Sequence, residues 1–129
     1  MKAKKLLLIC LFFSCTLPNI QNRTGIQEIA FGSGGGFAGQ FQKYKLMPDG
    51  RILDGEKVMA VIDYRKTFSI YKEAGELKDI QYNEPGNMYY FVEIISGSKS
   101  NQLVWEYGST AVNPKTTRLY NQLISLITP

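Results

Sequence analysis

The sequence predicts an α+β fold, an antiparallel sheet of about five to six strands with two helices on one face. Short runs rich in aromatic and β-branched residues alternate with Gly, Pro and Asp turn signals, and two segments place apolar residues at helical spacing. The expected order of elements is β-β-β-β-α-β-β-α. Runs of strands interrupted by two helices favour an antiparallel sheet with the helices gathered on one face.

Four strands are predicted in the first half of the domain, in residues 26–31, 37–47, 51–53 and 57–64. The first three are followed by glycine, proline or aspartate residues that favour turns or loops. The glycine run of residues 32–36 is expected to break the first strand. The fourth is expected to be a central strand, because apolar side chains occupy both of its faces.

The second of these strands allows two interpretations. Phe37, Phe41 and Tyr44 have helical spacing, whereas alternate residues from Phe37 fit one face of a strand. We favour the strand, because Gly39 weakens a helix and the Pro-Asp-Gly of residues 48–50 supplies the turn of a hairpin.

Two helices are predicted by apolar residues at helical spacing. Residues 67–77 form the first, with Thr67 as the expected N-cap. The second begins with Asn113 as N-cap and Pro114 as its first residue. Its apolar face is formed by Leu119, Leu123 and Leu126.

A hairpin is predicted between the two helices. Residues 88–95 and 102–107 are dense in aromatic and β-branched side chains, and a Gly-Ser-Lys-Ser-Asn turn separates them. Pro85 and Gly86 occupy the two central positions of a type II turn just before the hairpin.

The N-terminus predicts export. Residues 1–14 carry three lysines followed by an uninterrupted apolar run, which is typical of a bacterial secretion signal and is too short to span a membrane. Ser14 and Cys15 end that run and resemble the lipobox of bacterial lipoproteins, in which the cysteine becomes the lipid-modified N-terminus. The alternative is an unmodified Cys15 thiol in a discarded or uncleaved peptide. We expect lipid attachment at Cys15 and a location in the bacterial envelope, at the outer membrane and facing the periplasm.

The remaining chain is expected to form one domain on a short tether. Residues 15–25 are polar, contain a proline and show neither helical nor strand period, so they are interpreted as a lipid-attached tether. Residues 26–129 have a usual length for a single domain with one core.

The composition excludes several classes of function. The net charge of +4 falls to +1 when the three lysines of the signal are removed, and no basic cluster for nucleic acid remains. The chain has no histidine, and its two cysteines are Cys10 and Cys15, which removes the histidine-dependent triads and the usual zinc ligand sets. We therefore expect no nucleic-acid partner, no metal and no cofactor.

Four segments carry a resemblance to a known group of proteins. FGSGGGFAGQ, YKLMPDGRI, NEPGNMYYFVEI and LVWEYG occur in this order before a short C-terminal helix. In this arrangement the chain resembles small exported proteins and lipoproteins of Bacteroidota-type bacteria over residues 26–127. The resemblance implies the fold and the exported location, and it implies no activity and no site residues.

Two features are candidates for catalytic or phosphate chemistry. Residues 34–39 match the pattern G-x-G-x-x-G, but a phosphate cradle needs a helix directly after the glycines, so we favour a glycine-rich loop or bulge between two strands. The carboxylates of Asp63, Glu93 and Glu106 lie in or beside apolar strands, where burial can create a general acid. We favour the alternative, in which these carboxylates face solvent and no residue is catalytic.

Four aromatic residues are candidates for a ligand surface. Trp105 and Tyr107, with Tyr89 and Tyr90 on the neighbouring predicted strand, are suited to stacking on sugars or docking a protein. The favoured alternative is that Trp105 and Tyr107, which share a face, pack beneath the C-terminal helix.

The functional expectation is a non-enzymatic binding module of the cell envelope, held to the membrane by its N-terminal lipid. Its partner is expected to be an envelope protein or glycan. The rival hypothesis is a small carboxylate-dependent hydrolase that acts on envelope glycans.

Overall fold

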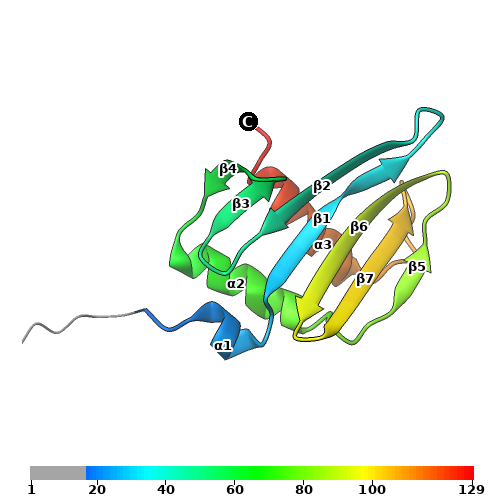
Figure 1. Ribbon diagram of the computed structural model, residues 1–129. Helices are drawn as coiled ribbons and strands as arrows, with labels where there is room; N and C mark the ends of the chain where they lie inside the picture. The colour runs from blue at the N-terminus through cyan, green and yellow to red at the C-terminus, as the bar shows by residue number, and fades with distance from the viewer. Residues whose placement is uncertain (1–16) are drawn as a thin grey trace, which may run out of the picture.

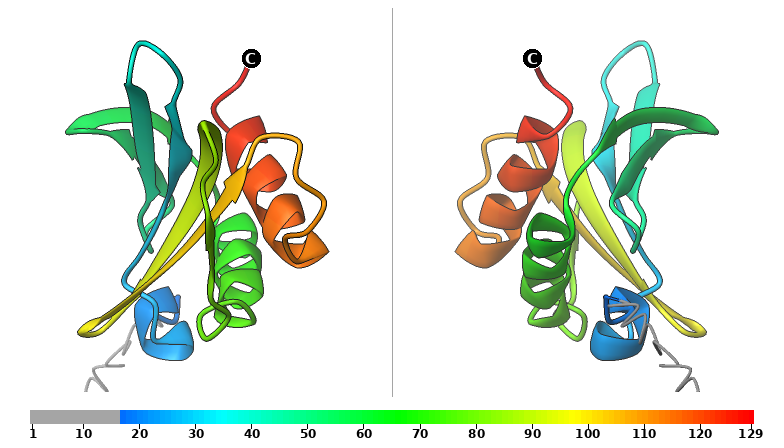
Figure 2. Two further views of the ribbon diagram at one scale, coloured as in Figure 1. Left: turned by 90° about the vertical axis from the view of Figure 1, so that its right-hand side faces the viewer. Right: turned by 90° about the vertical axis from the view of Figure 1, so that its left-hand side faces the viewer.

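The computed structural model describes residues 17–129, so the predicted signal and Cys15 lie outside the described residues. The helices are α1 (Ile20–Thr24), α2 (Tyr64–Gly75) and α3 (Pro114–Ser125). The strands are β1 (Glu28–Gly35), β2 (Gln40–Leu46), β3 (Arg51–Asp54), β4 (Lys57–Val61), β5 (Tyr82–Glu84), β6 (Met88–Ser96) and β7 (Lys99–Glu106). The α+β class is confirmed, with one sheet and two longer helices that cover one of its faces (Figure 1, Figure 2).

The sheet has seven strands in the order β4-β3-β2-β1-β6-β7-β5. All neighbouring strands are antiparallel except β5, which runs parallel to β7. The predicted count of five to six antiparallel strands is therefore too low, and β5 is the strand that the sequence pattern missed. Three residues are too few to show a period, and β5 exists because it pairs with β7.

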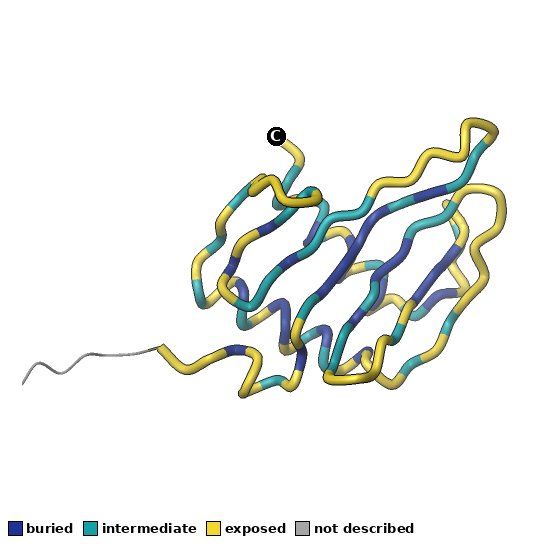
Figure 3. The backbone as a smooth tube through the Cα atoms, viewed as in Figure 1, coloured by how far each residue is buried: buried dark blue, intermediate teal, exposed yellow. Residues whose placement is uncertain are grey.

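The hydrophobic core lies between the sheet and helices α2 and α3. Phe31, Leu46 and Ile52 contribute to it from the sheet, and Leu119 and Leu123 contribute from α3. All five are fully buried, and Figure 3 shows the buried backbone concentrated in the central strands. Burying each of these side chains contributes roughly 1.5 to 3 kcal/mol.

The opposite face of the sheet is not covered by α2 or α3 (Figure 2). Phe41 of β2 stacks on Phe91 of β6 there, with ring centroids 5.6 Å apart. Lys43 forms an ion pair of 3.2 Å with Glu93 on the same face. This open face therefore combines aromatic contacts with charged pairs, as expected for a sheet face exposed to solvent.

The glycine run does not break the first strand, contrary to the sequence prediction. Strand β1 continues through Gly35, because aromatic side chains of β6 occupy the space above two of the glycines. Phe91 faces Gly32 and Tyr89 faces Gly34 across the antiparallel pair. These bulky side chains supply the packing that glycine lacks, which is known to stabilise glycines within sheets.

Part of the expected tether is a helix in the structure. Helix α1 has Asn19 as its N-cap and buries Ile20, which is 2% exposed. The guanidinium of Arg23 lies 4.1 Å from the centre of the Phe68 ring and donates a hydrogen bond of 3.1 Å to the hydroxyl of Tyr64. These contacts fix α1 against α2. No helix within residues 17–129 is long and apolar enough to cross a membrane.

Strand β4 and helix α2 also differ from their predictions. Strand β4 lies at the edge of the sheet rather than its centre, so Val58 and Val61 remain exposed. Helix α2 begins before Thr67, because Asp63 is its N-cap and accepts a hydrogen bond from the backbone NH of Lys66. The hydroxyl of Thr67 is buried and donates to the carbonyl of Asp63 instead.

Candidate functional site

Two rows of side chains gather on the helix-covered face of the sheet. They belong to the strand ends that lie away from α1 (Figure 1). In the first row, Ser33 of β1 pairs with Gln42 of β2 and with Tyr90 of β6. Tyr90 in turn pairs with Trp105 of β7. Directly opposed residues of antiparallel strands project to the same face, so these four side chains form one continuous row.

The second row lies one step nearer the end of the sheet. Gly35 pairs with Gln40 on one side and with Met88 on the other. Tyr107 follows β7, and its backbone NH donates to the carbonyl of Met88. Gly35 has no side chain, and a methyl group there would meet the backbone carbonyl of Asn87.

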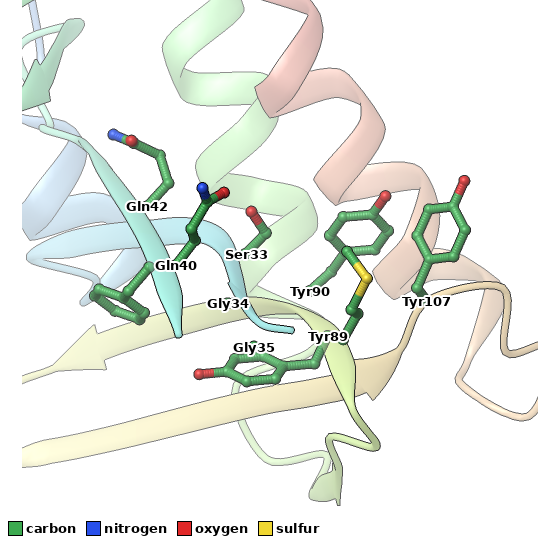
Figure 4. A pocket seen from close by; sticks show the side chains of 10 residues that line it. Ser33, Gly34, Gly35, Gln40, Gln42, Tyr89, Tyr90 and Tyr107 are labelled. Atoms are coloured by element: carbon green, nitrogen blue, oxygen red, sulfur yellow. The ribbon is translucent and has the colours of Figure 1, made fainter. Parts of the chain in front are cut away.

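The two rows border a cavity of about 550 Å³, which is in the usual range for small-ligand sites. It is lined by Ser33, Gly34, Gly35, Gln40, Phe41, Gln42, Met88, Tyr89, Tyr90 and Tyr107. We call this cavity the distal hollow. Figure 4 shows the side chains of Ser33, Gln40, Gln42, Tyr90 and Tyr107 on the side of the strands that faces the helices, with Tyr89 on the other side.

Tyr90 is held in place by other aromatic rings. It stacks on Tyr120 of α3 with ring centroids 4.7 Å apart, and its edge meets Trp105 at 6.1 Å and Tyr107 at 5.5 Å. Burial, and then the neighbouring Tyr107, raises the pKa of Tyr90 above its ordinary value. The Tyr90 hydroxyl is therefore protonated at neutral pH and is able to donate a hydrogen bond.

The other walls of the distal hollow are exposed. Tyr107 is 64% exposed and Met88 is 54% exposed, and the side chains of Gln40 and Gln42 also reach solvent. Phe37 lies in the turn between β1 and β2, which joins the lining residues Gly35 and Gln40, and it is completely exposed. Large exposed apolar and aromatic side chains that gather in one place are typical of binding surfaces.

The chemistry of the hollow is suited to binding. Its lining offers hydroxyl and amide groups for hydrogen bonds and aromatic rings for stacking, and it includes no acid, base or nucleophile with a partner that would activate it. Among residues 17–129, no group of three or more Asp, Glu, Cys or His side chains is placed to hold a metal ion.

The structure separates the four aromatic candidates into three environments. Trp105 is 2% exposed and packs against Tyr120 of α3, so the core interpretation holds for this residue. The same interpretation is wrong for Tyr107, which lies in the distal hollow together with Tyr90. Tyr89 borders the hollow from the open face of the sheet, where it lies across Gly34.

Four polar or flexible side chains of the site were not singled out from the sequence. Ser33, Gln40, Gln42 and Met88 face the hollow because β2 and β6 both pair with β1 along the glycine run. A strand that ended at residue 31 would not have placed them together. The sequence signal that could have identified Gln40 and Gln42 was their alternation with Tyr44, which places the three side chains on one face of a strand.

The three carboxylates considered for hydrolysis do not form a pair. Asp63 caps α2, and Glu93 binds Lys43 and Ser100 on the open face. Glu93 lies opposite Gln102, and the backbone of Glu106 is about 13 Å further along β7 at strand spacing, with its carboxyl group beside Gly86. Glycoside hydrolases hold their two carboxyl groups about 5 to 9.5 Å apart. The geometry therefore gives the hydrolase hypothesis no support.

The G-x-G-x-x-G match lies in a β-hairpin. Gly34 and Gly35 belong to β1, Gly36 and Gly39 form the turn, and β2 follows. Within residues 17–129 no helix N-terminus faces these glycines, as a phosphate cradle would require. The predicted loop is present only as the turn of residues 36–39, because Gly34 and Gly35 lie in the strand.

No protein-family model matches the sequence, and none of the curated proteins searched matches it.

Proposed function

We propose that this chain is an exported, lipid-anchored module of the bacterial envelope that binds an envelope component in the distal hollow. The observation that carries the proposal is the placement of Tyr90 and Tyr107 beside the amides of Gln40 and Gln42 in one open cavity. Rigid aromatic rings beside adaptable polar groups are typical of binding sites.

The position of the hollow supports an anchored module. The proposed lipid attachment at Cys15 precedes α1 closely in the sequence, and α1 is packed on α2 by Ile20 and Arg23. The turn between β1 and β2 lies at the opposite end of the molecule from α1 (Figure 1). An anchor at the N-terminus would thus leave the distal hollow directed away from the lipid, towards soluble or wall-bound partners.

A site-specific cross-linking experiment tests this proposal. A photoreactive benzoylphenylalanine replaces Phe37 in the full-length protein, which is expressed with its native signal and irradiated in intact cells. We expect a covalent adduct with an envelope component, because Phe37 is exposed in the turn that joins the lining residues Gly35 and Gln40. The added variant Tyr107→Ala should lower the adduct yield.

The control places the same photoreactive residue at Val61, which is 68% exposed but lies on the edge strand β4. This position should not give the Phe37 adduct. The proposal fails if Phe37 gives no adduct, if both positions give the same adducts, or if Tyr107→Ala leaves the yield unchanged.

A further inference from the structure

The lining that residues 17–129 form around the distal hollow carries no charged side chain. Its members are glycines, Ser33, Gln40, Gln42, Met88, Phe41 and three tyrosines. An ionic ligand would find no opposite charge there, and placing an ion against unpaired neutral groups is unfavourable. The hollow is therefore matched to an uncharged ligand.

The polar groups of the hollow are available for a ligand. Within residues 17–129, the side chains of Ser33, Gln40, Gln42, Tyr90 and Tyr107 take part in no hydrogen bond with another group of the protein. Each amide offers both donors and acceptors, and each hydroxyl does the same. This combination matches a ligand that carries several hydroxyl groups, because each of those is also both donor and acceptor.

The aromatic side chains supply the apolar half of the interaction. Tyr107 exposes most of its surface to the hollow and to solvent, and Tyr90 is fixed by Tyr120 and Trp105. A sugar ring has one face of C–H groups that packs on an aromatic ring and a rim of hydroxyls that bonds to amides. Fixed rings lose little conformational entropy when a ligand packs on them.

A peptide would not use the hollow by adding a strand. The lining strands β1 and β6 have neighbours on both sides, whereas residues 40–43 of β2 pair with β1 alone, because β3 meets β2 only at residues 44–46. Extended peptides gain most of their affinity from main-chain hydrogen bonds at a free sheet edge. A peptide strand added at this edge of β2 would lie in the plane of the sheet, beside the hollow and not over its face.

We infer that the distal hollow binds an uncharged carbohydrate, with Tyr107 stacking on a sugar ring next to Tyr90, and with Gln40 and Gln42 bonding to the sugar hydroxyls. This inference rests on the proposed function and names the ligand class of the same site. The cavity of about 550 Å³ accommodates a short segment of a glycan chain.

The test uses the full-length lipidated protein in a detergent without a sugar headgroup. Calorimetric titration is carried out with uncharged oligosaccharides of glucose, galactose, mannose and N-acetylglucosamine, and with oligogalacturonate as a carboxylated counterpart. We expect at least one uncharged oligosaccharide to bind, and oligogalacturonate to bind more weakly. Tyr107→Ala should weaken binding by about fivefold or more, as loss of an aromatic contact does.

The matched control is Val61→Ala, since Val61 is exposed to a similar extent and lies on the edge strand β4. This variant should bind the sugar as the parent protein does. The inference is overturned if no uncharged oligosaccharide binds, if oligogalacturonate binds best, or if both variants lose affinity equally. If no sugar binds while the Phe37 adduct still forms and still depends on Tyr107, the carbohydrate inference fails and the binding module stands. If the adduct is also absent, both fail.

Discussion

The ring of Tyr89 lies across Gly34, its partner on the neighbouring strand, so closely that a methyl group on Gly34 would come within 2.5 Å of the Tyr89 hydroxyl oxygen. Two residues along β1, a methyl group on Gly32 would overlap the backbone carbonyl of Gln42. Gly32 and Gly34 are thus required by close packing and not by a turn. The glycine run therefore belongs to the part of the sheet that lies beneath the distal hollow.

A series of glycine substitutions tests this packing. Gly32→Ala should destabilise the protein by about 3 kcal/mol or more, because backbone cannot move aside, whereas Gly34→Ala should cost about 1 kcal/mol, because the Tyr89 ring can rotate away. Gly75→Ala in α2 meets no neighbouring atom and should stabilise by about 0.5 to 1 kcal/mol. Urea unfolding followed by the fluorescence of Trp105 measures all three. Equal effects at Gly32 and Gly75 would refute the close-packing explanation.

Helix α3 should be an integral part of the core. Leu123 is completely buried, so Leu123→Ala should lower the free energy of unfolding by about 2 to 5 kcal/mol. Asn121 is exposed on the same helix, and Asn121→Ala should change stability by less than about 0.5 kcal/mol. Gln122 is a poorer control, because its Oε1 atom is buried without a hydrogen-bond partner. Similar losses for Leu123→Ala and Asn121→Ala would mean that α3 does not dock as described.

Stability should fall at alkaline pH. Burial, and then the charges of Glu28 and Asp49, raises the pKa of Tyr71, whose hydroxyl donates a bond of 2.7 Å to the carbonyl of Leu46. A tyrosine whose folded-state pKa is raised stabilises the fold fully below its unfolded pKa of about 10 and loses that contribution as pH rises above it. The slope from Tyr71 should approach about 1.4 kcal/mol per pH unit.

The comparison of wild type with Tyr71→Phe between pH 8 and pH 11 isolates this contribution. The variant loses the bond to Leu46, which costs about 1 kcal/mol at neutral pH, and its stability should fall less steeply above pH 10. Parallel curves for the two proteins would show that Tyr71 is not the group responsible.

The proposed lipid anchor makes a prediction for Cys15. In Cys15→Ala the protein should leave the membrane fraction or accumulate as an uncleaved precursor, because stable anchoring needs more than one acyl chain and the variant can accept none on this residue. Fractionation and gel migration of the variant compared with wild type measure this. A variant that fractionates and migrates as wild type does would exclude the lipobox interpretation.

Local signals predicted much of the fold. The cap and first residue of α3, Asn113 and Pro114, were identified correctly, and the aromatic residues of β6 and β7 formed the expected hairpin. The helix cap and the hairpin are determined by residues that are close together in the sequence. Helix α1 was missed although Asn19 caps its start and Gly25 ends it with a positive φ of 74°, since a helix of this length has too few residues to show a period.

The remaining features depend on residues that are distant in the sequence. Strand β1 extends through the glycines because Tyr89 and Phe91 of β6 pack on them. This contact cannot be predicted from the residues that are close to the glycines in the sequence. Three of the four aromatic candidates do border the site, but the sequence could not separate buried Trp105 from exposed Tyr107 on the same face. That difference arises because α3 covers the sheet at Trp105 and not at Tyr107.

The central claim is that the distal hollow itself binds the envelope component, and NMR tests it most directly. Tyrosine rings of the lipidated protein are labelled with ¹³C, and their NMR signals are followed while solubilised envelope material is added. If the ligand binds in the distal hollow, the signals of Tyr90 and Tyr107 should shift. The signal of Tyr64, which lies beside α1, should stay in place. A shift at Tyr64 with Tyr90 and Tyr107 unchanged would contradict this claim, as would the absence of any shift.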